Sequence, residues 1–286
     1  MTQPPVQPRR SFIFAPGTRP DMFPKALKSG ADIVCVDLED AIAPQDKAAA
    51  RAKTLALFAE PQEDDGVERI LRINCTRTPE GMADLQAVVA SPAPPPALML
   101  PKVKSPDELR ALDELLDEHG LATRLHVIIE TNDGLEACYA IARASPRIEA
   151  LFFGGVDMAA DLRCRATWEA LLYARARVVH AAAGAGLDAI DVPYLDLNDL
   201  EGMKREAEAA AALGFTGKGS IHPKQVPVLN AVFSPDEATL AHARRIVEAF
   251  EESGSGLVVV DGKLLEKPVL RSMYRILAAG ERARAP

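Results

Sequence analysis

The sequence predicts a closed (βα)8 TIM barrel, a parallel α/β fold, with a C-terminal helix–hairpin–helix extension. Short β-branched runs recur along the chain, helical stretches separate them, and polar residues end most of the runs. Alternating strands and helices build a parallel sheet covered by helices, and eight such units can close into a barrel. The eight candidate strands are residues 11–17, 33–40, 68–74, 97–103, 125–131, 150–157, 187–196 and 214–223.

The alternative architecture is a doubly wound open sheet. It is disfavoured because no G-x-G-x-x-G segment follows the first run. Ser105-Pro106-Asp107-Glu108 combines an N-cap residue, a Pro in the first turn and a capping-box acid, and it predicts a helix start between two strands. Residues 234–237 repeat that signal and predict a helix that runs to about residue 252.

The C-terminal residues have no place in an eight-unit barrel. Residues 256–268 predict a hairpin that turns at Asp261-Gly262, and a helix is expected over about residues 269–279. We therefore expect a catalytic barrel domain at residues 1–233 and a separate extension at residues 234–286.

Composition excludes several classes of protein. The 286 residues are 48% hydrophobic, enough for a large core, and the formal net charge of −8 disfavours nucleic acid as a partner. The first ten residues lack the apolar core of a signal peptide, and no apolar run approaches the length that spans a bilayer. We expect a cytoplasmic protein without a membrane partner. The four scattered cysteines form no CxxC pair and are expected to be reduced thiols.

Two acidic residues at the ends of neighbouring predicted strands indicate a metal site. Glu130 ends the fifth run, and Asp157 ends the sixth run after two glycines. Neighbouring strands lie about 4.8 Å apart, so both carboxylates can reach one ion. Mg²⁺ suits this pair because it commonly takes one or two protein carboxylates and keeps water or substrate oxygens. Each acid also has a structural interpretation: Glu130 could pair with an Arg or cap the next helix, and Asp157 could cap a helix beginning near Met158.

Arg72 lies inside the third predicted strand and requires an anion. Its partner could be Glu39 or Asp40 in a buried ion pair, or a substrate carboxylate gripped by the guanidinium fork. The cluster of Asp37, Glu39 and Asp40 could itself bind metal, but we favour a role in orienting Arg72.

Two further segments invite both functional and structural interpretations. The turn after the first strand could present Arg19, and then Lys25, to a phosphorylated ligand, although such a Gly/Pro turn is more often only a turn. His222 has no Ser or Cys nucleophile arranged with it, so we interpret it as a hydrogen-bonded structural residue rather than a base.

The chain resembles the citrate lyase β-subunit-like group, which includes malyl-CoA and citramalyl-CoA lyases. The resemblance covers nearly the whole sequence. It rests on the segment at residues 10–42 and on the motifs LRIN at Leu71, LPKV at Leu100, IIET at Ile128, FGGVDMAADL at Phe153 and GKGSIHPKQ at Gly217.

The resemblance implies a magnesium-dependent TIM-barrel lyase that cleaves β-hydroxyacyl thioesters by a retro-Claisen reaction. It assigns the metal to Glu130 and Asp157, the substrate to Arg72, and the CoA phosphates to Arg19 and Lys25. It further implies a homotrimer, or a dimer of trimers, in which a hairpin residue enters a neighbour's site. In those lyases that residue is Asp, and here it is Glu266, which could also be a solvated charge beside Lys267.

Several functions are compatible with this predicted fold and set of site residues. The first is a lyase acting on a malyl-, citramalyl- or citryl-type CoA thioester to give an acetyl thioester and an oxo-acid. The alternatives are the β-subunit of a citrate lyase acting on a carrier-protein thioester, a CoA-independent aldolase, and a non-catalytic CoA-ester-binding protein.

Overall fold

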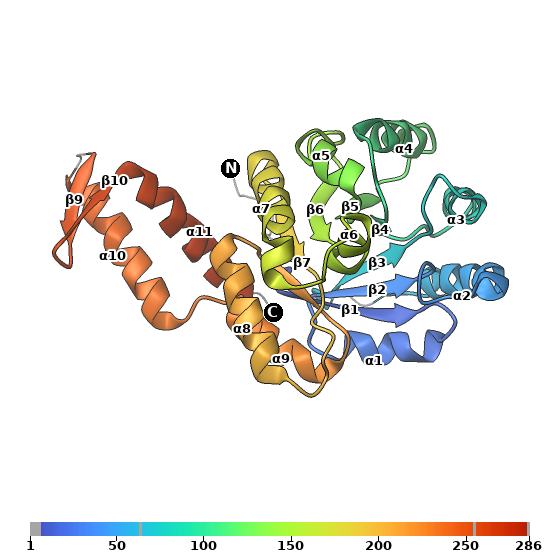
Figure 1. Ribbon diagram of the computed structural model, residues 1–286, viewed down its shortest axis with the longest axis horizontal. Helices are drawn as coiled ribbons and strands as arrows, with labels where there is room; N and C mark the ends of the chain where they lie inside the picture. Colours follow the sequence, from blue (N-terminus) through green and yellow to red (C-terminus); the bar gives the residue numbers. More distant parts are fainter. Residues whose placement is uncertain (1–6, 63–64, 254–255, 285–286) are drawn as a thin grey trace. The chain divides into compact units, whose positions relative to one another are not determined.

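The computed structural model describes residues 7–62, 65–253 and 256–284. Eight parallel strands form a closed barrel in the order β1 to β8, which confirms the predicted fold class (Figure 1). Their bounds are β1 Ser11–Pro16, β2 Ile33–Asp37, β3 Glu68–Arg72, β4 Ala97–Leu100, β5 Arg124–Ile129, β6 Ile148–Phe153, β7 Asp188–Asp191 and β8 Gly217–Ser220.

Helices follow the strands and surround the barrel. They are η1 Pro20–Met22, α1 Phe23–Leu27, η2 Pro44–Asp46, α2 Lys47–Ala59, α3 Pro79–Val89, α4 Pro106–Glu118, α5 Asn132–Ile141, α6 Gly155–Asp161, α7 Trp168–Ala185, α8 Leu200–Leu213, η3 Pro223–Gln225 and α9 Val226–Val232. The predicted start at Ser105 is confirmed, because its hydroxyl accepts a hydrogen bond from the amide of Asp107 at 3.1 Å. Local capping chemistry thus sets where this helix begins.

The barrel interior has charged residues at both ends and an apolar layer between them. At the amino-terminal end, Arg9 Nε donates to Glu68 Oε2 at 2.7 Å, and His126 Nε2 lies 2.9 Å from Glu68 Oε1. At the carboxyl-terminal end lie Asp37 and Arg72, directly paired in the register of β2 and β3. The apolar layer between them consists of Phe12, Ile33, Cys35, Ile70, Ala97, Met99, Ile128, Ala150, Phe152 and Ile190.

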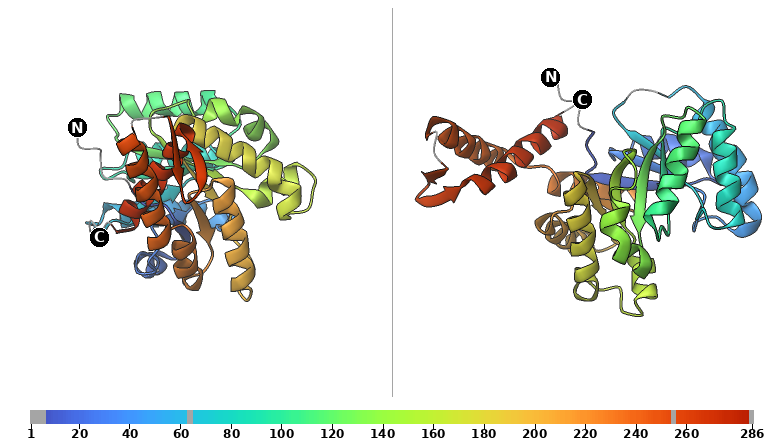
Figure 2. Two further views of the ribbon diagram at one scale, coloured as in Figure 1. Left: turned by 90° about the vertical axis from the view of Figure 1, so that its left-hand side faces the viewer. Right: turned by 90° about the horizontal axis from the view of Figure 1, so that it is seen from above.

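Contacts divide the chain into two compact units. The barrel unit runs from Arg9 to Asn230, and the second unit contains the residues from Ala231 onward. Within the second unit, α10 (Glu237–Ser253) and α11 (Lys267–Arg284) lie side by side, and the two-stranded hairpin of β9 (Leu257–Val260) and β10 (Lys263–Glu266) lies at one end of the pair (Figures 1 and 2). The helix–hairpin–helix order is as predicted.

The details of the second unit differ from the prediction in two places. Helix α10 begins at Glu237, and Asp236, rather than Ser234, accepts the hydrogen bond from the amide of Thr239 at 2.7 Å. Helix α11 is longer than predicted at both ends. The predicted turn is confirmed, because Asp261 and Gly262 have φ angles of 51° and 75°, as a two-residue I′ turn requires.

Candidate active site at the carboxyl end of the barrel

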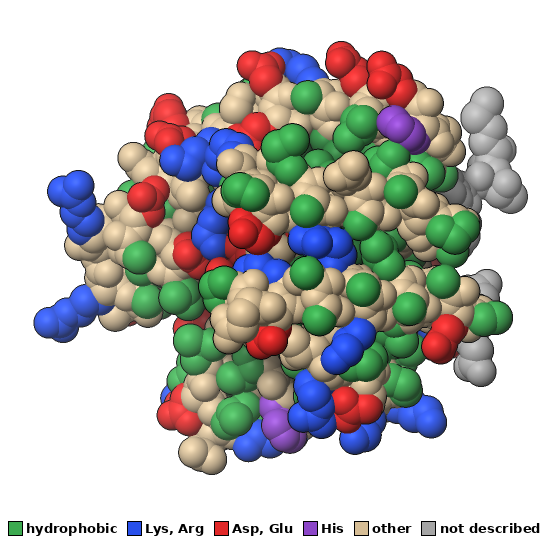
Figure 3. Space-filling view, turned by 90° about the vertical axis from the view of Figure 1, so that its right-hand side faces the viewer, with side chains coloured by type: hydrophobic (Ala, Val, Ile, Leu, Met, Phe, Trp, Pro, Cys, Tyr) green, Lys and Arg blue, Asp and Glu red, His purple; other side chains and the backbone are tan. Residues whose placement is uncertain are grey.

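The strand ends bring together the polar residues that the sequence placed there. Asp37 and Arg72 are the last residues of β2 and β3, and Glu130 directly follows β5. Figure 3 views the barrel from the side to which β1, β2 and β3 point, and it shows acidic and basic side chains gathered near the centre of that face. Active sites of (βα)8 barrels lie at this end. The expectation that these groups converge is therefore confirmed.

Arg72 is held by the acidic cluster of the second strand end. Its Nε and Nη2 donate to Asp37 Oδ1 and Oδ2 at 2.7 and 2.8 Å, and its Nη1 lies 3.1 Å from Glu39 Oε2. The guanidinium also lies over the ring of Phe14, 4.5 Å from the ring centre. Burial opposes the charge of Arg72, but these carboxylates outweigh it and raise the pKa above its usual range. The side chain is therefore a fixed cation.

The partner of Arg72 differs in part from the prediction. Glu39 is one of the two ion-pair partners expected, but the bidentate partner is Asp37, and Asp40 instead contacts Lys102. The expectation that the acidic cluster orients Arg72 is confirmed for Asp37 and Glu39. The reason is the register, because Asp37 and Arg72 lie opposite each other on adjacent strands and their side chains share a face.

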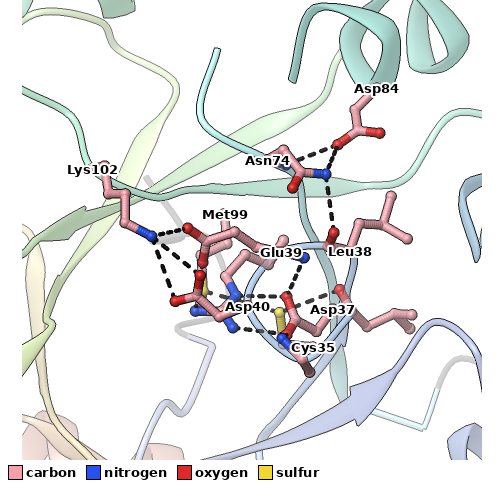
Figure 4. A network of polar contacts seen from close by, with 12 residues as sticks. Cys35, Asp37, Leu38, Glu39, Asp40, Asn74, Asp84, Met99 and Lys102 are labelled. Carbon is pink, nitrogen blue, oxygen red and sulfur yellow. Dashed lines mark hydrogen bonds and ion pairs between the residues drawn. The ribbon is translucent and has the colours of Figure 1, made fainter. Parts of the chain in front are cut away.

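Lys102 is a cation that the sequence interpretation did not single out. Its ammonium group contacts a carboxylate oxygen of Glu39 and lies 3.3 Å from Asp40 Oδ1 (Figure 4). Its backbone N–H donates to Glu130 Oε1 at 2.7 Å. Lys102 has a positive φ of 55°, a conformation that non-glycine residues seldom adopt. One residue thus touches three of the acids in the site.

Glu130 is a buried carboxyl group in an acidic environment. It is only 3% exposed. Burial, together with the negative charges of Glu39 and Asp157, raises its pKa to about 8. The side chain lies over Gly154, where a Cβ atom would come within 2.4 Å of Glu130 Oε2. Gly154, one of the two glycines that precede Asp157, is therefore required by the position of the Glu130 side chain.

Asp157 lies in the first turn of α6 rather than at the end of a strand. The predicted strand over residues 150–157 ends at Phe153, and the helix begins at Gly155 rather than near Met158, because the two glycines end the strand. Gly154 occupies the N-cap, so Asp157 does not cap the helix. Within the described ranges, Asp157 has no hydrogen bond or ion pair from its carboxylate. The Glu130 side chain lies against Gly154, the N-cap residue of the helix whose first turn holds Asp157, and the negative charge of Asp157 contributes to the raised pKa of Glu130.

The remaining candidates occupy the following positions. Arg19 is exposed and pairs with Asp21 at 2.9 Å, and Lys25 is an exposed residue of α1. His222 Nδ1 accepts a hydrogen bond from the amide of Lys224 at 3.1 Å, as its structural interpretation requires. Glu266 is the exposed last residue of β10, in the second unit.

The donor set fits a hard divalent cation. Asp37, Glu39, Asp40, Glu130 and Asp157 outnumber the cations Arg72 and Lys102, so the site is acidic. Across the described part of the chain, no three His, Cys, Asp or Glu side chains are arranged to hold a metal by themselves. Two carboxylates with open positions suit Mg²⁺, which keeps water and substrate oxygens among its ligands.

Comparisons with known proteins identify relatives that align with nearly the whole chain. The chain is 33% identical to the L-malyl-CoA/beta-methylmalyl-CoA lyase of Rhodobacter capsulatus over an alignment of 315 positions, gaps included, which covers 99% of this chain and 98% of that one. It is 32% identical to citrate lyase subunit beta of Escherichia coli K12, covering 96% and 93% of the two chains.

A solved structure is also similar. The protein CitE of Mycobacterium tuberculosis, in complex with magnesium, acetoacetate and coenzyme A, is 29% identical, with a TM-score of 0.79 and coverage of 94% of this chain and 97% of that one. The family profile described as HpcH/HpaI aldolase/citrate lyase matches residues 10–223, most of the chain. This chain belongs to the HpcH/HpaI aldolase/citrate lyase family.

Proposed function

We propose that the chain is a magnesium-dependent carbon–carbon lyase that cleaves a β-hydroxyacyl-CoA thioester into an acetyl thioester and an α-oxo-acid. The observation that carries the proposal is the pair of carboxyl groups, Glu130 and Asp157, at the same end of the barrel as the fixed cation Arg72. Lyase activity agrees with the names of the relatives, and magnesium with the complexes of the CitE protein. The acyl group is of the citramalyl, malyl or citryl type.

In this proposal Glu130 and Asp157 hold the metal, and Arg72 binds the carboxylate of the oxo-acid half. When bound, magnesium would stabilise negative charge on the oxygen of the β-carbon. Cleavage transfers the hydroxyl proton to a base and breaks the bond between the α- and β-carbons. The electron pair of that bond forms a thioester enolate, which a proton then converts to the acetyl thioester. Asp37 keeps Arg72 oriented throughout, since both of its carboxylate oxygens are bound to the guanidinium.

Arg19 and Lys25 are the proposed contacts for the CoA phosphates. Both are exposed and basic, and both lie just beyond β1 at the carboxyl end of the barrel. Arg19 is already paired with Asp21 at the surface, where solvent screening leaves such a pair weak. A phosphate could therefore displace Asp21 at little cost.

The hairpin supports a proposed homo-oligomer, either a trimer or a dimer of trimers. Val258 packs against Ile246 and Phe250, so one face of the hairpin is covered by α10. The opposite face carries Leu257, Val259 and Leu264, which are 49%, 68% and 65% exposed. Glu266 is paired with Leu257 and so shares this apolar face. We propose that this face covers the barrel of a neighbouring subunit. The face then belongs to an extension at residues 234–286, and the barrel that it covers to the domain at residues 1–233 of the neighbour.

Replacing Arg72 with lysine is expected to weaken oxo-acid binding or slow turnover at least tenfold, a loss of about 1.4 kcal/mol. Lysine keeps the charge, but its single nitrogen cannot form the two parallel hydrogen bonds to Asp37, contact Glu39 and still donate to a substrate carboxylate, as the five N–H groups of arginine can. Steady-state kinetics of the variant, with its fold checked by circular dichroism, provide the measurement. Unchanged kinetics would assign Arg72 to structure alone.

The substrate class is tested by assaying the purified chain with magnesium on citramalyl-CoA, on malyl-CoA, and on citryl thioester attached to its carrier protein. We expect cleavage of a CoA thioester, with release of pyruvate or glyoxylate. Turnover of the carrier-protein thioester alone would instead assign the chain as a citrate lyase β-subunit. Turnover of free oxo-acids that is unaffected by added CoA would identify the chain as a CoA-independent aldolase. Tight binding of a thioester without any turnover would identify it as a non-catalytic CoA-ester-binding protein.

A further inference from the structure

A polar network behind the site fixes the loop that carries Glu39. Strand β2 ends at Asp37, so the carbonyl groups of Leu38 and Glu39 lie beyond the strand. Lys47 Nζ donates to Leu38 O at 3.0 Å, to Glu39 O at 2.9 Å and to Asn74 Oδ1 at 2.5 Å. One ammonium group therefore uses all three of its protons on this loop and its neighbour.

Asn74 and Asp84 complete the network. The Asn74 amide nitrogen donates to Leu38 O at 3.0 Å and to Asp84 Oδ2 at 2.7 Å, and its backbone N–H donates to the same Asp84 oxygen at 2.8 Å (Figure 4). Arg51 Nε donates to Asp84 Oδ1 at 2.6 Å. Asn74 and Asp84 are 5% and 1% exposed. Both side chains are thus saturated with specific partners.

The position of Lys47 is unfavourable for its own helix. Lys47 is the first residue of α2, where the helix dipole disfavours a positive charge. This unfavourable position is offset by the three hydrogen bonds that the Lys47 ammonium group donates to oxygens of the loop and of Asn74. Such departures from local preference occur where a side chain serves the site rather than its own element.

The loop in turn sets the position of the Glu39 carboxylate. Glu39 lies between Arg72, whose Nη1 is 3.1 Å away, and the ammonium group of Lys102. The backbone N–H of Glu39 donates to Asp37 Oδ1 at 2.9 Å, the same oxygen that Arg72 Nε contacts. A shift of the loop would therefore disturb both acids that orient Arg72.

We propose that Lys47, Asn74 and Asp84, the anchoring network, are positioning residues that act through Glu39 on Arg72. The network does not touch substrate. It keeps the loop at residues 38–40 in the one arrangement in which Glu39 bridges Arg72 and Lys102. This inference rests on the proposed function in one respect, the binding of an oxo-acid carboxylate by Arg72.

The test compares Lys47→Met with Lys53→Met, which removes an exposed lysine from the same helix. Calorimetry with pyruvate in excess Mg²⁺ should show about tenfold weaker binding for Lys47→Met, about 1.4 kcal/mol. The Kd for Mg²⁺ alone should change less than about twofold, since Glu130 and Asp157 are not in the network. Lys53→Met should match the wild type in both measurements. Lys47→Arg, which can donate to the same oxygens, should recover most of the lost affinity.

A double-mutant cycle separates positioning from general structure. In a Glu39→Gln background, Lys47→Met should weaken pyruvate binding less than about threefold, because the carboxylate through which Lys47 acts is already gone. An undiminished tenfold effect in that background, or equal losses in Lys53→Met, would overturn the inference.

Failure of the proposed function gives a different result. If the wild type binds neither pyruvate nor oxaloacetate with Mg²⁺, the proposed substrate class is wrong, and hydrogen exchange then decides on the anchoring network. The amides of Glu39 and Ala41, which donate to Asp37, should exchange at least about tenfold faster in Lys47→Met than in Lys53→Met. Equal exchange in the two variants would refute the network.

Discussion

Replacing Glu130 with glutamine is expected to abolish magnesium-dependent turnover while making the metal-free protein more stable at alkaline pH. Turnover should fall by at least about a thousandfold, which corresponds to roughly 4 kcal/mol of lost transition-state stabilisation. Glutamine keeps the shape above Gly154 and can still accept the hydrogen bond from Lys102. It cannot supply the anionic oxygen that a metal ligand provides.

The stability gain follows from the raised pKa of Glu130. Its folded-state pKa of about 8 lies above the ordinary value of 4.5. Below pH 4.5 the carboxyl group is protonated in both states and carries no penalty. Between pH 4.5 and 8 the unfolded chain loses the proton first, so the free energy of unfolding falls as the pH rises. Each pKa unit corresponds to about 1.4 kcal/mol, so metal-free Glu130→Gln should gain a few kcal/mol at pH 8 or above.

Three measurements check this prediction. Urea unfolding in EDTA should show the variant more stable than the wild type at pH 8.5 and nearly equal at pH 4.5. Asp157→Asn should also lose turnover, whereas Asp133→Asn, which removes an exposed acid in the first turn of α5, should remain active. Wild-type turnover that persists in EDTA would refute a metal at Glu130 and Asp157.

The barrel was predictable from sequence because its strands carry a strong local signal. Runs such as residues 33–37 are fully buried and rich in β-branched residues, and polar residues end or follow most of the runs. Parallel topology then requires those polar ends to meet at one face. The meeting of Asp37, Arg72 and Glu130 follows from these two facts alone.

Pairings across the barrel were harder to predict. The partner of Arg72 depends on strand register, which the sequence did not specify, and the register selects Asp37. Lys102 was not singled out from the sequence, because its role depends on a positive φ that turns its amide toward Glu130 while its ammonium group reaches Glu39. Lys47 lies 27 residues from Asn74 in sequence, and no local pattern connects the two.

Mixing two inactive variants is expected to restore activity if the hairpin completes a neighbour's site. Glu130→Ala chains retain an intact Glu266, and Glu266→Ala chains retain an intact Glu130. After dissociation and reassembly in equal amounts, about a quarter of the sites in a closed ring should combine an intact barrel with an intact hairpin. Each variant alone should be nearly inactive, so the gain should be large.

The exposed face of the hairpin is the physical reason to expect a shared site. Val259 and Leu264 pair across the strands and leave most of their surface exposed, an unfavourable state for a chain with no partner. Covering a barrel mouth would bury that face, bring Glu266 to the site and exclude water from a reactive enolate. A Val259→Asp, Leu264→Asp variant should therefore lose both assembly and activity, as measured by light scattering and turnover. Activity in a verified monomer would rule out the shared site, and so would the absence of recovery in verified mixed oligomers. Full activity of the Glu266→Ala variant by itself would show that Glu266 has no role in catalysis.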